Sequence, residues 1–328
     1  MDKREAITED NLGPVVSLLT WIMAAAVIIA VGIKFTLSSI IPGKRNREDV
    51  ALFLATVFSI GFTVSMSLAV SNGIGRHEDT LSSHQLESLQ KSVYSSDILL
   101  VLISTCVQAS VLIFLHEITP DDLHHMLIYG IAGFITLFFI ASFFVAVFPC
   151  DAPDVWEVLG VQCIDQLSFW EAFAGVNLVI ESALVFLPIM IVYPVMMERR
   201  RKSIVISGFA ARLAVVGTFI AQLYEAQSLK SYLFDRTFYG WKYLLTTVFV
   251  QGLSIITVCI PYIRNLLLGM ESGMIQTGHY RLPSRHSTET GIALRHIPIS
   301  TTDTDFSGNT TAKPEATATS HRKKDDNV

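Results

Sequence analysis

Charged residues are scarce in this chain of 328 residues, since Asp, Glu, Lys and Arg together make up only 16% of it. Soluble domains average roughly 25% charged residues, so the deficit needs a cause. The charges that are present collect in short islands between apolar runs of about 20 residues, the length at which a helix crosses a bilayer. The net charge of −5, without a basic domain, excludes the electrostatic footprint of a nucleic-acid partner.

Apolar runs dominate what is there, and seven of them are long enough to span a hydrocarbon core of about 30 Å as helices. The sequence therefore predicts an all-α fold, a polytopic membrane protein built as a bundle of seven transmembrane helices. The weakest segment contains Arg212 and Gln222, and without it six helices would remain. The seven segments are approximately 15–33, 50–71, 96–115, 126–148, 170–193, 204–223 and 243–263.

Three regions follow from this pattern. We expect an extracellular or lumenal N-terminus over 1–14, a membrane domain over 15–268 and a disordered cytosolic tail over 269–328. The tail is rich in Ser and Thr and cannot bury enough apolar surface to offset its ordering entropy. A cleaved signal peptide is the alternative for the first segment, but the apolar core of such a peptide has only about 7–15 residues.

The loops indicate an orientation. Lys and Arg in short loops favour the cytosol, and 42–49 and 197–203 are short and basic. Of the four cysteines, only Cys150 and Cys163 lie outside apolar runs, and they share one loop. Disulfides persist in oxidising compartments, so a Cys150–Cys163 bond would face the exterior or a lumen. Both observations favour N-terminus out and C-terminus in, although basic residues summed over all loops are nearly balanced, and two free cytosolic thiols are the alternative.

Ionisable groups within membrane helices are costly, and they are usually paired or functional. At 1.5 Å per residue, Glu181 and Arg212 fall at nearly the same depth on consecutive helices, which predicts an ion pair. Asn177 lies one turn from Glu181, and Gln108 and Gln251 lie at similar depth on other helices. These five residues either hold the helices together through hydrogen bonds or line a polar pocket for a small molecule.

Two further charged residues were expected near the helix ends. Lys34 lies near the inner end of the first segment, where its side chain can extend to the membrane surface. Asp97 lies near the outer end of the third segment, where we expect it to be solvated. Leu86, Leu89 and Val93, which precede it in a polar connection over 72–95, could share one face of a small interfacial helix.

Catalytic and cofactor motifs are missing from the sequence. The nine histidines show no zinc-site spacing, so no metal is expected, and no nucleophile elbow or phosphate-binding loop is present. A retinal Schiff base needs a lysine amine, and the last apolar segment contains none between Tyr243 and Pro261. We expect no cofactor.

The order of several landmarks resembles the fungal rhodopsin domain-containing family of seven-helix integral membrane proteins. An acidic pair opens the second helix, a basic stretch follows the fifth, and a G-x-G-x-H element follows the second, while other positions carry neutral residues where the family often has charges. The matching residues are Glu48, Asp49, Gly73, Gly75, His77, Cys150, Pro153, Trp156, Cys163, Asn177, Glu181, Pro188, Arg199–Lys202, Pro261 and Arg264.

We expect a multi-pass protein of the plasma membrane or endomembranes. The resemblance implies its roles, since members are described as receptor-like or are encoded among genes for secondary metabolism. We expect a non-enzymatic, receptor-like protein that binds a small lipophilic ligand and acts on a cytosolic partner. The alternative is an accessory protein or enzyme that acts on a lipophilic intermediate, with Glu181 as an acid. A transporter is disfavoured because no two-fold repeat is evident.

Overall fold

Seven long helices and one short helix make up the described part of the computed structural model, which covers residues 12–40, 47–77, 81–119, 122–150, 164–192, 210–230 and 236–271. Contacts divide the chain into units 1–280 and 281–328, and all described residues belong to the first. Its helices are α1 (Gly13–Ile40), α2 (Arg47–Ser71), α3 (Ser83–Ile118), α4 (Asp122–Val147), α5 (Gln166–Val192), α7 (Leu213–Lys230), α8 (Arg236–Tyr239) and α9 (Trp241–Glu271).

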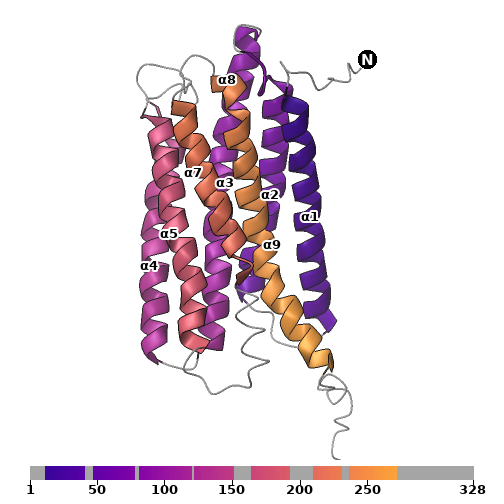
Figure 1. Ribbon diagram of the computed structural model, residues 1–328, viewed down its shortest axis with the longest axis vertical. Helices are drawn as coiled ribbons and strands as arrows, with labels where there is room; N and C mark the ends of the chain where they lie inside the picture. The colour runs from indigo at the N-terminus through magenta and orange to yellow at the C-terminus, as the bar shows by residue number, and fades with distance from the viewer. Residues whose placement is uncertain are drawn as a thin grey trace, which may run out of the picture. The chain divides into compact units, whose positions relative to one another are not determined.

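The long helices lie side by side and alternate in direction (Figure 1). α2 packs against α1 and α3, α5 packs against α7, and α9 packs against both α1 and α7. The largest cluster of buried apolar side chains draws on α1 to α5 and α9, and it includes Leu52, Ile103, Leu184 and Ile255. A separate cluster of Ala174, Val215, Phe219 and Val250 packs α7 against α5 and α9.

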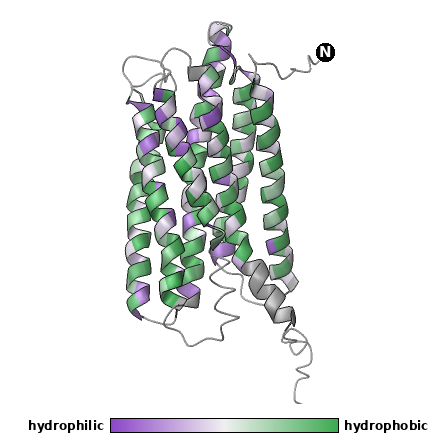
Figure 2. Cartoon of the chain, viewed as in Figure 1, coloured by the Kyte–Doolittle hydropathy of each residue, from purple (hydrophilic) through white to green (hydrophobic). Residues whose placement is uncertain are grey.

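Apolar side chains also cover the outside of the bundle (Figure 2). Ile29, Phe53, Leu137 and Phe186 are each more than half exposed, on four different helices. Exposed apolar surface of this extent belongs against lipid rather than water. Six helices, α1 to α5 and α9, are long and apolar enough to cross a membrane, and the protein is a multi-pass membrane protein.

α7 differs from the other long helices. Its 18 described residues end in the polar sequence from Glu225 to Lys230, and α7 is not among the candidate spans. The predicted segment ran from 204 to 223, whereas the structure begins α7 only at Leu213, after a turn at Ala211 and Arg212. Residues 204–209 lie outside the described part, so a seventh crossing remains a prediction.

α3 begins 13 residues before the predicted segment. Ser82 caps it, because the Ser82 hydroxyl accepts a hydrogen bond from the Gln85 amide and the Gln85 side chain accepts one from the Ser82 amide. This capping box starts the helix at Ser83. The separate interfacial helix predicted around Leu89 is therefore wrong, and those residues form the first turns of α3, which extend beyond the neighbouring helices (Figure 1).

A glycine turn joins α2 to α3 at this same end of the bundle. Gly73 and Gly75 have φ angles of 124° and 83°, a region that favours glycine. The Gly75 carbonyl accepts a hydrogen bond from the Leu12 amide at 3.2 Å, next to the start of α1. The His77 ring stacks on Phe238 of α8, with ring centroids 4.2 Å apart. The turn therefore joins α1, α2 and α8.

Candidate functional site

A layer of polar side chains crosses the interior between α3, α5 and α7. Gln108 Nε2 donates to Asn177 Oδ1 at 2.8 Å, and Asn177 Nδ2 donates to the Phe173 carbonyl on its own helix at 2.8 Å. Glu181 lies one helical turn after Asn177 on α5. Gln108, Asn177 and Glu181 are at most 3% exposed, so these bonds are shielded from solvent.

Arg212 completes this layer from the turn that precedes α7. Arg212 Nη1 donates to Glu181 Oε2 at 2.7 Å, and both side chains are 2% exposed. This is the ion pair that the matching depths on consecutive helices predict. Arg212 Nη2 is buried and has no hydrogen-bond partner among the described residues. The guanidinium is therefore only partly satisfied where it lies.

The backbone around Arg212 is not regular helix. The Ala214 amide donates to the Ala211 carbonyl at 3.2 Å and the Val215 amide donates to the Arg212 carbonyl at 2.9 Å, so these bonds close over three residues instead of four. Tight turns of this type are common at helix ends, and the Arg212 carbonyl also accepts the regular helical bond from the Val216 amide at 3.2 Å.

Gln251 does not belong to this layer. Its Nε2 donates to the Ser59 hydroxyl at 2.8 Å and so joins α9 to α2. A third polar contact lies nearer the start of α9, where Gln222 Nε2 donates to the Thr247 hydroxyl at 2.8 Å. The five polar residues selected from the sequence thus form two groups rather than one: four between α3, α5 and α7, and Gln251 by itself.

A second buried ion pair was missed by the sequence reasoning. Lys34 Nζ donates to Asp49 Oδ1 at 2.7 Å, and the two side chains are 2% and 9% exposed. The expectation that Lys34 extends to the membrane surface is wrong, because the acidic residue just across the α1–α2 connection draws it inward. The sequence did contain the information, since Lys34 and Asp49 flank the same short loop.

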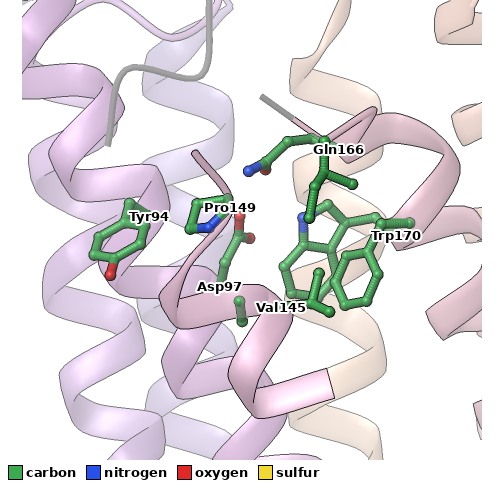
Figure 3. Close-up of a pocket in the computed structure, with 9 residues that line it drawn as sticks. Tyr94, Asp97, Val145, Pro149, Gln166 and Trp170 are labelled. Carbon is green, nitrogen blue, oxygen red and sulfur yellow. The ribbon is translucent and has the colours of Figure 1, made fainter. Parts of the chain in front are cut away.

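A small cavity lies at the end of the bundle where α3 and α5 begin. It has a volume of about 10 Å³ and is lined by Tyr94, Asp97, Val145, Ala146, Pro149, Ile164, Gln166, Phe169 and Trp170. Figure 3 shows Asp97, Gln166 and Trp170 around this space. Asp97 was expected in solvent at a helix end, but α3 begins about four turns earlier, at Ser83, and the residue lies partly buried between helices.

Local contacts hold the walls of this cavity in place. The Tyr94 hydroxyl donates to the Val147 carbonyl at 2.8 Å and joins α3 to the end of α4. Asp165 caps α5, because its carboxylate accepts hydrogen bonds from the Ser168 hydroxyl at 2.6 Å and the Ser168 amide at 3.4 Å. These hydrogen bonds lower the pKa of Asp165. Trp170 packs edge-on against Phe169 and Phe173.

The comparison with protein families decides what this bundle is. A family model described as the fungal rhodopsin domain matches residues 33–269, well over half of the chain. The chain belongs to the fungal rhodopsin domain family. No curated protein matches it.

The motif residues of this fungal rhodopsin domain fall into two sets. Gly73, Gly75 and His77 form the turn that contacts α1 and α8. Pro153, Trp156 and Cys163 lie outside the described residues, so the Cys150–Cys163 disulfide remains a prediction. The Ile164 amide donates to the Pro149 carbonyl at 3.0 Å, which brings the two ends of this loop together next to both cysteines.

The name rhodopsin raises the question of retinal, and the residues of α9 do not fit it. A Schiff base needs a lysine amine, and the only lysine in α9 is Lys242, the second residue of the helix. Its Nζ lies 5.9 Å from the centre of the Trp241 ring, at the end of the bundle. Among the described residues of the fungal rhodopsin domain, no group of three or more His, Cys, Asp or Glu side chains could hold a metal ion.

Proposed function

We propose that this fungal rhodopsin domain protein is a receptor-like membrane protein. In this proposal a small lipophilic ligand binds between the helices at the end where α3 and α5 begin, and the change is transmitted to the opposite end. The Glu181–Arg212 pair is the observation that supports it. We propose that it acts as a lock between α5 and α7 that has a closed and an open arrangement.

The energetics of the pair favour such a lock. Two charges taken out of water lose several kcal/mol of hydration each, and their attraction offsets this only when every polar group is satisfied. In the part of the chain that the structure describes, Arg212 Nη2 lacks a partner, and a buried donor without one costs roughly 1–3 kcal/mol. The tight turn at Ala211 and Arg212 gives the chain a place to bend. An open arrangement in which the guanidinium reaches water therefore lies within a few kcal/mol of the closed one.

The enzyme alternative has weaker support. A catalytic acid must lie within hydrogen-bonding reach of its substrate. Glu181 is 2% exposed and already binds Arg212, so a substrate could reach it only after the same opening. We propose that the N-terminus lies outside. This orientation puts the start of α7, next to the Glu181–Arg212 lock, and the basic stretch 197–203 toward the cytosolic side.

The lock can be tested with a variant that keeps the fold. Replacing Glu181 and Arg212 together by Met removes both charges and fills a similar volume, which is often neutral or stabilising. Spin labels at exposed positions Phe186 on α5 and Leu213 on α7, in a background with Cys106 and Cys259 replaced by Ala, would report the spacing of the two helices. We expect a longer or broader distance distribution in the double variant than in the wild type.

The matched control is the other buried pair. The Lys34→Met/Asp49→Met variant also removes two buried charges, but it removes them from the pair that joins α1 to α2. It should therefore leave the Phe186–Leu213 distance unchanged. An unchanged distance in the Glu181→Met/Arg212→Met variant would refute the lock. Conversion of a lipophilic metabolite by membranes containing the wild type, but not by those containing Glu181→Gln, would establish the enzyme instead.

A further inference from the structure

Asp97 lies on α3 at the cavity, and its carboxylate has no hydrogen-bond or ion-pair partner in the described part of the protein. Asp49 and Glu181, by contrast, each hold a cation at 2.7 Å. The Asp97 side chain points into the cavity at the start of α5 (Figure 3). Acids at membrane depth that lack a partner are costly, and they mark binding sites or proton paths.

The walls of the cavity suit a cation. Tyr94, Phe169 and Trp170 contribute aromatic rings, whose faces attract positive charge. The Gln166 side chain also lines the cavity and makes no hydrogen bond within the described residues, so its oxygen is available to a donor. The closest basic side chain on α7, Lys230, already pairs with Glu171. Two acceptors and aromatic faces, with no basic residue among those that line the cavity, define a site for a positively charged group.

The size of the cavity restricts the charged group. A volume of about 10 Å³ is close to the minimum that holds one water molecule. A primary ammonium has a similar size and three donors, whereas a quaternary ammonium carries three methyl groups more. A bare metal ion is disfavoured, because Asp97 is the only carboxylate among the lining residues and hard cations need several oxygen ligands.

We propose that this cavity binds the protonated head group of a lipophilic primary amine, with Asp97 as its counter-ion. The ammonium donates to the Asp97 carboxylate and to the Gln166 oxygen, and the apolar body of the ligand packs against the aromatic side chains. This assignment names the ligand class of the proposed receptor. Only the effect of ligand binding on the Glu181–Arg212 lock rests on the proposed function. Binding itself can be measured separately.

The cavity and the lock share one face of α5. Trp170, Phe173, Asn177 and Glu181 recur at intervals of three and four residues, and each is at most 7% exposed. Residues at this spacing lie on the same side of a helix. A ligand that displaces Trp170 would therefore rotate or shift the face that carries Asn177 and Glu181, which connects the amine site to the lock through rigid packing.

The test measures binding of phenethylamine to the full-length protein in nanodiscs of neutral lipid. We expect saturable binding to the wild type and binding at least roughly 30-fold weaker to Asp97→Asn, since removing one partner of a desolvated charge pair has effects of this size. The uncharged 2-phenylethanol and the bulky N,N,N-trimethyl analogue should each bind much more weakly than phenethylamine to the wild type.

Glu87→Gln is the matched control, because it removes a carboxylate from an exposed position of the same helix and should leave amine binding unchanged. No saturable amine binding, equal binding by Asp97→Asn, or equal binding of the alcohol would overturn the proposal. Equal binding of the trimethyl analogue would refute the primary-amine assignment. If the amine binds but leaves the Phe186–Leu213 distance unchanged, the site stands and the receptor function fails.

Discussion

Lys34 Nζ lies 2.7 Å from Asp49 Oδ1, and this pair joins α1 to α2 in the interior of the bundle. Breaking such a pair from one side leaves an uncompensated charge, which costs roughly 3–5 kcal/mol. We therefore expect Lys34→Met and Asp49→Leu to lower the thermal midpoint sharply when measured singly. The double variant should recover most of the loss, because it leaves no charge behind.

The exposed pair Lys91–Glu87, whose side chains are 49% and 54% exposed, is the control for this cycle. Surface pairs contribute little, so Lys91→Met should leave the midpoint unchanged. If the Lys34→Met variant is as stable as the wild type, the buried pair does not hold α1 to α2.

The turn at Gly75 should tolerate no side chain. A Cβ there would lie 2.6 Å from the Gly13 amide nitrogen, a backbone atom that cannot move aside, and the φ angle of 83° is unfavourable for alanine. We expect Gly75→Ala to lower stability by about 1–3 kcal/mol in a thermal or denaturant assay. Gly217→Ala is the control, since nothing lies within 4 Å of its Cβ position, and it should be neutral or slightly stabilising. Equal midpoints for the two variants would argue against the strained turn.

The hydrogen bond between Gln251 and Ser59 connects the last helix to the second. Interhelical hydrogen bonds in membranes average about 0.6 kcal/mol by double-mutant cycles, so Gln251→Leu and Ser59→Ala should couple by roughly 0.5–1.5 kcal/mol. Unfolding in mixed micelles measures this energy for the two single variants and the double variant. Additive effects would show that the contact contributes nothing beyond packing.

The predicted disulfide can be tested by alkylation. Cys106 and Cys259 are free, so a denatured, unreduced protein should take up two alkyl groups, and a reduced one should take up all four. Mass spectrometry of the peptides that contain Cys150 and Cys163 identifies the bonded pair. Uptake of four groups before reduction would exclude the disulfide. If the bond is present, its removal should cost about 3 kcal/mol for a loop of this length.

Sequence reasoning found some contacts and missed others, because only some contacts follow from the positions of residues along the sequence. The Glu181–Arg212 pair could be predicted because depth along a helix is linear in residue number. Lys34 was misplaced because it lies near the end of its helix, where its side chain could reach either the membrane surface or Asp49 across the short loop. Only packing decides between these two environments. The start of α3 was missed because polar residues near Gln85 look like a loop until their capping role is recognised.

The cavity at Asp97 lay beyond such reasoning. Its lining comes from α3, α4 and α5 and from the ends of the loop between the last two, and no spacing rule brings these residues together. Gln251 shows the same limit, since two residues at equal depth on different helices need not face each other. Rotation of each helix about its axis is a tertiary property, and it separates Gln251 from the layer around Gln108.

The stacking of His77 on Phe238, together with the Leu12–Gly75 hydrogen bond, joins α1, α2 and α8 at one end of the bundle. At the other end of α1 and α2, the Lys34–Asp49 pair joins the same two helices. α5 and α7 are joined by Lys230–Glu171 near the start of α5 and by Glu181–Arg212 near the start of α7. We therefore expect α1 and α2 to keep their relative position in any rearrangement, whereas loss of the Glu181–Arg212 contact would let the start of α7 move away from α5.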